Sequence, residues 1–121
     1  MAEAPDGYAG QHFFSEVEAL NDQLDGMVDG MREAGRRKAQ AEHDYRVALA
    51  KRMWELRSQG TPVTVLGDLS RGDEAVALLR LRRDAAESDY WTSQEAIKVG
   101  KIRVRTVAEQ IAREWGRPSN Q

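Results

Sequence analysis

The sequence predicts an all-α fold, namely a long antiparallel two-helix coiled-coil hairpin with a short helix at the bend. Two heptad patterns cover most of the 121 residues, and each alternates steps of three and four residues. Apolar side chains at this spacing over four or more heptads are typical of helices that pack along a seam. The segment between the patterns is too short for another large element, so the chain is expected to fold back on itself. The first pattern comprises Val17, Leu20, Leu24, Met27, Met31, Ala34, Lys38, Ala41, Tyr45 and Ala48, and the second comprises Val76, Leu79, Arg83, Ala86, Tyr90, Ser93, Ile97, Gly100, Val104, Val107 and Ile111.

The distribution of charge favours the same fold. Residues 1–30 carry seven acidic and no basic side chains, whereas residues 98–117 carry six basic and two acidic side chains. In an antiparallel hairpin these stretches lie side by side, and opposite charges beside a seam select orientation more than they add stability. Few aromatic residues and a negative mean hydropathy also favour a narrow apolar stripe over a thick core.

The first long helix is expected over residues 13–59, after a flexible N-terminal tail at residues 1–12 that is rich in glycine and proline. Ser15 and Glu18 have the spacing of a capping box at a helix start. Gly60 is a natural C-terminal stop for this helix.

The connection predicts a short helix over residues 62–71. Thr61 before Pro62 is typical of an N-cap followed by a first-turn proline. The apolar face of this helix consists of Val63, Leu66 and Leu69, or alternatively of Val65 and Leu69. Gly72 is expected to end it with a positive φ.

The second long helix is expected over residues 74–115, with residues 117–121 as a C-terminal tail. Asp73 should cap its start, and Glu74 lies favourably in its first turn. Gly116 and Pro118 end the helical pattern.

Two features of the predicted seam bear on function. Lys38 and Arg83 fall at core positions, where they either lay their stems along the seam or fix its register. Many large apolar side chains lie off the stripe, so we expect two hairpins to associate as a homodimer with a four-helix cross-section. These off-stripe side chains are Phe13, Val28, Leu49, Met53, Trp54, Leu78, Leu81, Trp91, Ile102 and Trp115.

The sequence carries no recognisable catalytic chemistry. The chain has no cysteine, no phosphate-binding glycine loop and no nucleophile or zinc-protease motif. His43 lies between Glu42 and Asp44, but neighbours on a helix face different directions, so we interpret it as a surface residue. We therefore expect a protein that is not an enzyme and has no metal or cofactor. The absence of a membrane-length apolar run or a signal peptide favours a cytoplasmic protein without a membrane partner.

Basic side chains leave nucleic-acid binding open as an alternative. Phosphate contacts are commonly made by lysine and arginine. The acidic pI and the spread of the bases around the helices favour a solvated, salt-bridged surface instead. The candidate nucleic-acid contacts are Arg36, Arg37, Lys98, Lys101, Arg103 and Arg105.

Three stretches of the chain carry a family resemblance. They are AEHDYRVALAKRMWELRSQG, VTVLGDLSRGDEAVALLRLRRDAAESDYWTSQEAI and IAREWG. With their patterns AExxYRxAxAK, DLxxGD and RDxAExxYxxxxEAI, residues 39–116 resemble a group of small uncharacterised phage and prophage proteins of Gram-positive bacteria. The resemblance implies a phage accessory protein from an early or replication and recombination gene region, and it assigns no activity. We therefore expect a non-enzymatic interaction or scaffold protein that acts through its helix faces on a protein partner, with accessory nucleic-acid binding as the alternative.

Overall fold

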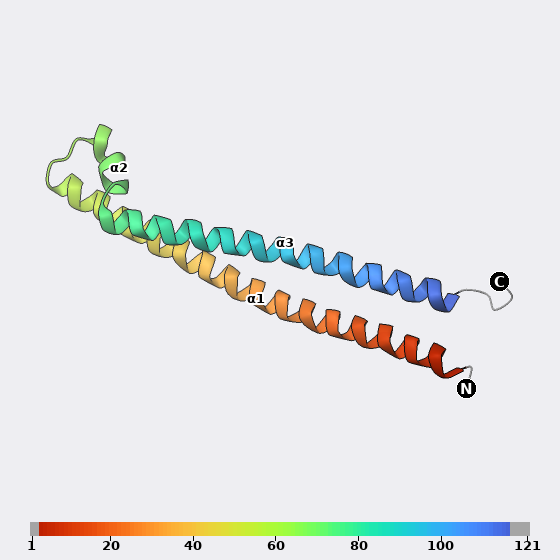
Figure 1. The fold of residues 1–121 in the computed structure, drawn as a ribbon. Helices are drawn as coiled ribbons and strands as arrows, with labels where there is room; N and C mark the ends of the chain where they lie inside the picture. Colours follow the sequence, from red (N-terminus) through yellow and green to blue (C-terminus); the bar gives the residue numbers. More distant parts are fainter. Residues whose placement is uncertain (1–2, 117–121) are drawn as a thin grey trace. The chain divides into compact units, whose positions relative to one another are not determined.

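The computed structural model describes residues 3–116, with side chains from residue 11 onward, and this part of the chain is almost entirely helical. Its three helices are α1 (Glu3–Ser58), α2 (Val63–Arg71) and α3 (Glu74–Gly116). Figure 1 shows the short helix α2 between the two long ones. The predicted all-α fold is confirmed, as is the packing of two long helices against each other.

The chain forms two compact units, and each long helix contributes to both. The terminal unit pairs residues 3–30 of α1 with residues 93–116 of α3. The bend unit comprises residues 31–92 and contains α2. The predicted acidic and basic stretches therefore belong to the same unit.

Both heptad patterns coincide with the covered face of their helix. Every residue of the two patterns is buried or half-buried, whereas the intervening positions of the terminal unit are almost all exposed. The most enclosed apolar side chains of the described residues are Ala34, Tyr45, Leu56, Val76 and Ile97. Heptad spacing therefore identified the seam residues correctly, because only residues three and four apart share one face of a helix.

Small residues let the helices approach closely along this seam. In the terminal unit, a Cβ added to Gly100 would lie 3.2 Å from Cδ1 of Leu24 and 3.4 Å from Sδ of Met27. In the bend unit, a Cβ at Gly35 would lie 3.3 Å from Cε1 of Tyr90. A larger side chain at either position would push its neighbour aside.

The start of α1 differs from the sequence prediction. The helix begins at Glu3, so the described part of the predicted tail at residues 1–12 is helical, and Ser15 lies inside the helix rather than at its N-cap. Pro5 falls in the first turn, where the backbone N–H that proline lacks has no helical partner. Residues 1–2 and the predicted C-terminal tail at 117–121 lie outside the described residues.

The end of α1 is closed by a Schellman motif, as the expected stop at Gly60 implied. The Thr61 N–H donates to the Leu56 carbonyl at 3.0 Å, and the Gly60 N–H donates to the Arg57 carbonyl at 3.1 Å. Gly60 has a φ of 91°, a conformation that favours glycine. The helix ends at Ser58, one residue before the predicted end at 59.

Helix α2 packs through a face other than the predicted one. Its covered side consists of Leu66, Gly67 and Ser70, whereas Val63, Val65 and Leu69 are exposed. Two small residues on the covered side allow a close approach that the larger side chains would prevent. Pro62, rather than Thr61, is the N-cap, and its carbonyl accepts from the Val65 N–H at 3.2 Å. The helix starts at Val63, one residue after the predicted 62.

The step from α2 to α3 corrects one prediction and confirms another. Gly72 has a φ of −81°, so the expected positive φ is wrong, and its N–H donates to the Asp68 carbonyl as in a continuing helix. Asp73 caps α3 as predicted, because its Oδ2 accepts from the Val76 N–H at 3.2 Å. The same carboxylate places Oδ1 3.2 Å from Nε of Arg52, which ties the start of α3 to α1. Helix α3 extends to Gly116, one residue beyond the predicted 115.

Candidate functional site

The centre of the bend-unit seam holds two reciprocal contacts between a basic side chain and a tyrosine. The guanidinium of Arg83, on α3, lies 4.6 Å from the ring centroid of Tyr45, on α1. The ammonium of Lys38, on α1, lies 5.5 Å from the ring centroid of Tyr90, on α3. Both distances suit a cation–π attraction. Each long helix thus contributes one cation and one ring to the seam.

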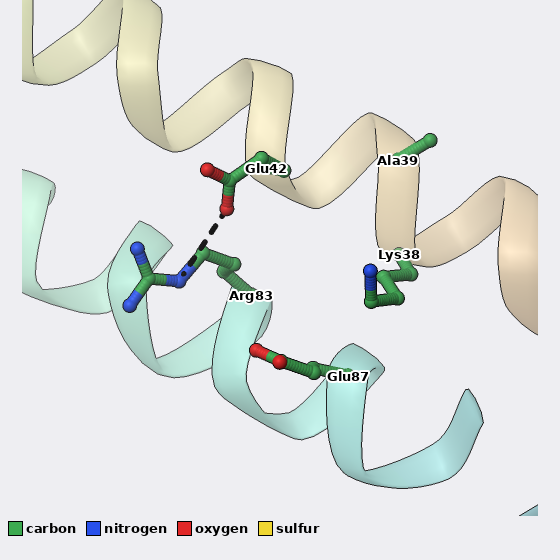
Figure 2. A pocket seen from close by; sticks show the side chains of 5 residues that line it. All are labelled: Lys38, Ala39, Glu42, Arg83 and Glu87. Atoms are coloured by element: carbon green, nitrogen blue, oxygen red, sulfur yellow. Dashed lines mark ion pairs between the residues drawn. The ribbon is translucent and has the colours of Figure 1, made fainter. Parts of the chain in front are cut away.

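Two carboxylates lie beside Arg83. Nε of Arg83 lies 3.6 Å from Oε2 of Glu42, as the dashed line in Figure 2 marks, and Nη2 of Arg83 lies 2.9 Å from Oδ1 of Asp84. Glu42 also accepts a hydrogen bond from Nε of Arg46 at 2.6 Å, and this bond lowers the pKa of the Glu42 carboxyl, with Arg83 and Lys38 adding to the effect. The hydrogen bond to Asp84 raises the pKa of Arg83. These contacts favour the ionised forms of Glu42 and Arg83.

These side chains line a shallow hollow of about 680 Å³, formed by Lys38, Ala39, Glu42, Arg83 and Glu87. In Figure 2, Lys38 and Glu87 project from opposite helices into the same space. Two cations and two carboxylates make the lining formally neutral. Nothing in this geometry activates a nucleophile, and no group of three metal-ligating side chains is found in the described part of the chain. The cluster joins helices, so we name these charged residues and the two tyrosines the register cluster: Lys38, Glu42, Tyr45, Arg83, Glu87 and Tyr90.

The register cluster corresponds to an internal repeat that heptad analysis did not detect. Residues 37–45 read RKAQAEHDY and residues 82–90 read RRDAAESDY, so five of the nine positions are identical and one exchanges lysine for arginine. The repeat relates Lys38 to Arg83, Glu42 to Glu87 and Tyr45 to Tyr90. A comparison of the sequence with itself would have revealed this signal, whereas heptad spacing registers only the apolar character of each position.

The repeat explains why the contacts are reciprocal. Because each copy places a cation seven residues before a tyrosine, the cation of one copy reaches the ring of the other in both directions. The residue numbers of the contact partners on α3 decrease as those on α1 increase. Gly35 lies beside Tyr90, Glu42 beside Arg83, and Arg52 beside Asp73. The cluster therefore favours one alignment of the two helices, which supports the register interpretation of Lys38 and Arg83.

His43 lies outside this cluster. Its side chain is exposed, and its Nδ1 lies 3.2 Å from Oδ1 of the adjacent Asp44. That carboxyl also accepts from Nε2 of Gln40 at 2.8 Å, and the two hydrogen bonds lower the pKa of Asp44. His43 thus occupies the helix surface that its position in the sequence indicated.

The six candidate nucleic-acid contacts are exposed but fall in two different units. Arg36 and Arg37 belong to the bend unit, where Arg36 pairs with Glu33 and Arg37 lines a second hollow of about 220 Å³ beside Arg82. The terminal unit contains the other four, Lys98, Lys101, Arg103 and Arg105. Lys98 pairs with Glu95 on its own helix, at 3.1 Å. The acidic stretch of α1 and these four bases belong to the same unit, as the predicted pairing of the two stretches requires.

Large apolar side chains are more numerous on the surface than in the interior of the described residues. Five apolar residues are buried, whereas thirteen large ones are exposed. The exposed group comprises Phe14, Val28, Val47, Trp54, Val63, Val65, Leu69, Leu78, Leu81, Trp91, Val99, Ile102 and Trp115. Three of them, Val63, Val65 and Leu69, form the outer side of α2.

No known protein family, curated protein or solved structure matches this chain. Within the described residues, no helix combines the length and apolar character that crossing a membrane requires. The register cluster and the exposed apolar side chains are therefore the features of the molecule that bear on its function.

Proposed function

We propose that this chain is a non-enzymatic interaction or scaffold protein whose packed helices form an antiparallel coiled coil and whose outer helix faces bind other proteins. One observation carries the proposal, namely the excess of exposed over buried large apolar side chains in the described residues. Large apolar side chains that stay exposed on helix faces are available to bind other proteins. The resemblance of residues 39–116 to phage and prophage proteins supports an accessory role in phage biology. The cytoplasmic location stays a prediction.

The proposal includes two kinds of partner. One is a host or phage protein, and the other is a second copy of this chain, which means self-association. Light scattering at micromolar concentration tests it, since a homodimer has twice the 13.6 kDa mass of one chain. Replacing the exposed Leu81 by Gln should lower the measured mass, whereas the neighbouring Arg82→Gln serves as a matched surface control. A mass of one chain at every concentration, together with no protein recovered in a pull-down from the host, would contradict the proposal.

Accessory nucleic-acid binding is the alternative, and one observation favours it. Lys101, Arg103 and Arg105 are exposed and lie close together on α3 in the terminal unit. Phosphate binding by these residues would give an affinity that falls steeply with salt. A DNA-binding titration at several salt concentrations separates the two functions, because the interaction protein proposed above shows no such affinity.

A further inference from the structure

The repeat makes the register cluster complementary to itself. Lys38 meets Tyr90 and Arg83 meets Tyr45, so α1 offers α3 the same cation-and-ring arrangement that it receives. The charges at equivalent positions have the same sign in both copies of the repeat. The same contacts can also form between α1 of one chain and α3 of a second copy.

The bend between the helices presents a second unusual feature. Helix α2 buries Ser70, which is 0% exposed, and leaves Val63 65% exposed. The Ser70 hydroxyl has no hydrogen-bond partner in the described structure, so the buried side of α2 gains little from its position. Trp54, near the end of α1, is 73% exposed. The apolar side chains that precede and form the bend therefore lack a cover.

We propose that two copies of this chain exchange their second long helix, so that α3 of each copy packs on α1 of the other through the register cluster. The proposal rests on the self-association proposed above and names its geometry. Exchange keeps the contacts of Arg83 with Tyr45 and of Arg52 with Asp73, because each is made once in every pairing of α1 with α3. Exchange changes only the conformation of the connection around residues 59–73.

Exchange also accounts for the uncovered bend. When two hairpins open and pair, their connections meet at the dimer axis, as in other domain-swapped proteins. The exposed side chains Val63, Val65 and Leu69 of one copy then face the same residues of the other. The exchanged geometry therefore brings a second copy of the chain to the bend. Burial of the apolar side chains between the two bends offsets the entropy that association costs.

The absence of cysteine allows a direct test in the full-length chain. Ala41 and Ala86 are equivalent positions of the repeat, and both are half-buried on the seam. One chain carries Ala41→Cys and the other carries Ala86→Cys. The two are unfolded together in denaturant, refolded as an equal mixture, and treated with a short thiol-to-thiol cross-linker. Exchange predicts that about half of the dimers cross-link, since random pairing of two chains gives that share of mixed dimers.

Several outcomes overturn exchange. No mixed cross-link, although light scattering shows a dimer, means that closed hairpins associate side by side, and self-association then stands without exchange. Cross-linking of Ala41→Cys chains with one another, and not with Ala86→Cys chains, means that two α1 helices pair instead. A monomeric mass overturns exchange and self-association together.

Two controls make the result specific. Ala39→Cys with Ala77→Cys places thiols at exposed positions far from each other along the bend unit, so this mixture should give no more than background cross-linking. A single chain with both Ala41→Cys and Ala86→Cys should cross-link between chains under exchange and within the chain in a closed hairpin. Far-ultraviolet circular dichroism of every variant verifies that the helices have formed before cross-linking.

Discussion

At the scale of single residues, the seam is organised by polar side chains at core positions. Arg83 places its charged group above the ring of Tyr45 and keeps its ion pairs with Glu42 and Asp84 at the edge of the seam. A cation in contact with a ring and with carboxylates retains partners for its charge without full burial. These specific contacts favour one register of the two helices, which purely apolar positions would not do.

A double-mutant cycle measures this contact. Arg83→Met and Tyr45→Leu keep apolar volume on the seam and remove the cation–π attraction, so the pair should show a coupling energy of about 0.5–1 kcal/mol in unfolding experiments. Arg82→Met combined with Tyr45→Leu is the matched control, because Arg82 is exposed beside Arg83 and has no contact with that ring. Equal coupling in the two cycles would show that the ring contact does not contribute.

At the scale of the elements, the bend depends on one glycine. Gly60 has a φ of 91° and closes the Schellman motif at the end of α1. An alanine there places a Cβ in the left-handed region, which costs about 1–2 kcal/mol. Gly60→Ala should therefore lower the free energy of unfolding by about that amount in a denaturant titration.

Gly30→Ala is the control for this substitution. Gly30 lies inside α1 with no atom within 4 Å of an added Cβ, so alanine should raise the free energy of unfolding by about 1 kcal/mol through its higher helix propensity. Opposite signs for the two glycines distinguish the turn from the helix. A free energy of unfolding that Gly60→Ala leaves unchanged or raises would contradict the assignment of the bend.

Some features of these elements were predictable from the sequence, and others were not. The end of α1 at Gly60 and the cap at Asp73 were predictable, because each depends on one residue type in its local context. The covered side of α2 was not predictable, because periodicity shows which residues share a face but does not show which face meets a neighbouring helix. Thr61 before Pro62 fitted an N-cap equally well in the sequence, but Thr61 belongs to the Schellman motif that ends α1, and Pro62 occupies the N-cap position of α2.

At the scale of the whole molecule, heptad spacing identified both seam faces and the elements that carry them. The start of α1 was missed because glycines and a proline near the N-terminus resemble a tail in a local reading, although a first-turn proline is compatible with a helix. The register cluster was missed because its signal lies in the identity of residues at two distant positions. Folding brings residues 37–45 and 82–90 together, and only then do their charges and rings acquire partners.

Distances between spin labels in the bend unit test whether the repeat aligns α1 with α3 in one antiparallel register, as we propose. Ala50 and Ala77 are exposed and close to level in this register, so labels on Ala50→Cys and Ala77→Cys should give a short distance. Moving the first label to Ala39→Cys shifts it by eleven residues, or about 16 Å, along α1, so the distance should increase clearly. Exchange between copies keeps both distances, because the same register forms between chains. A distance that stays the same or shortens when the label moves from Ala50→Cys to Ala39→Cys would contradict the register.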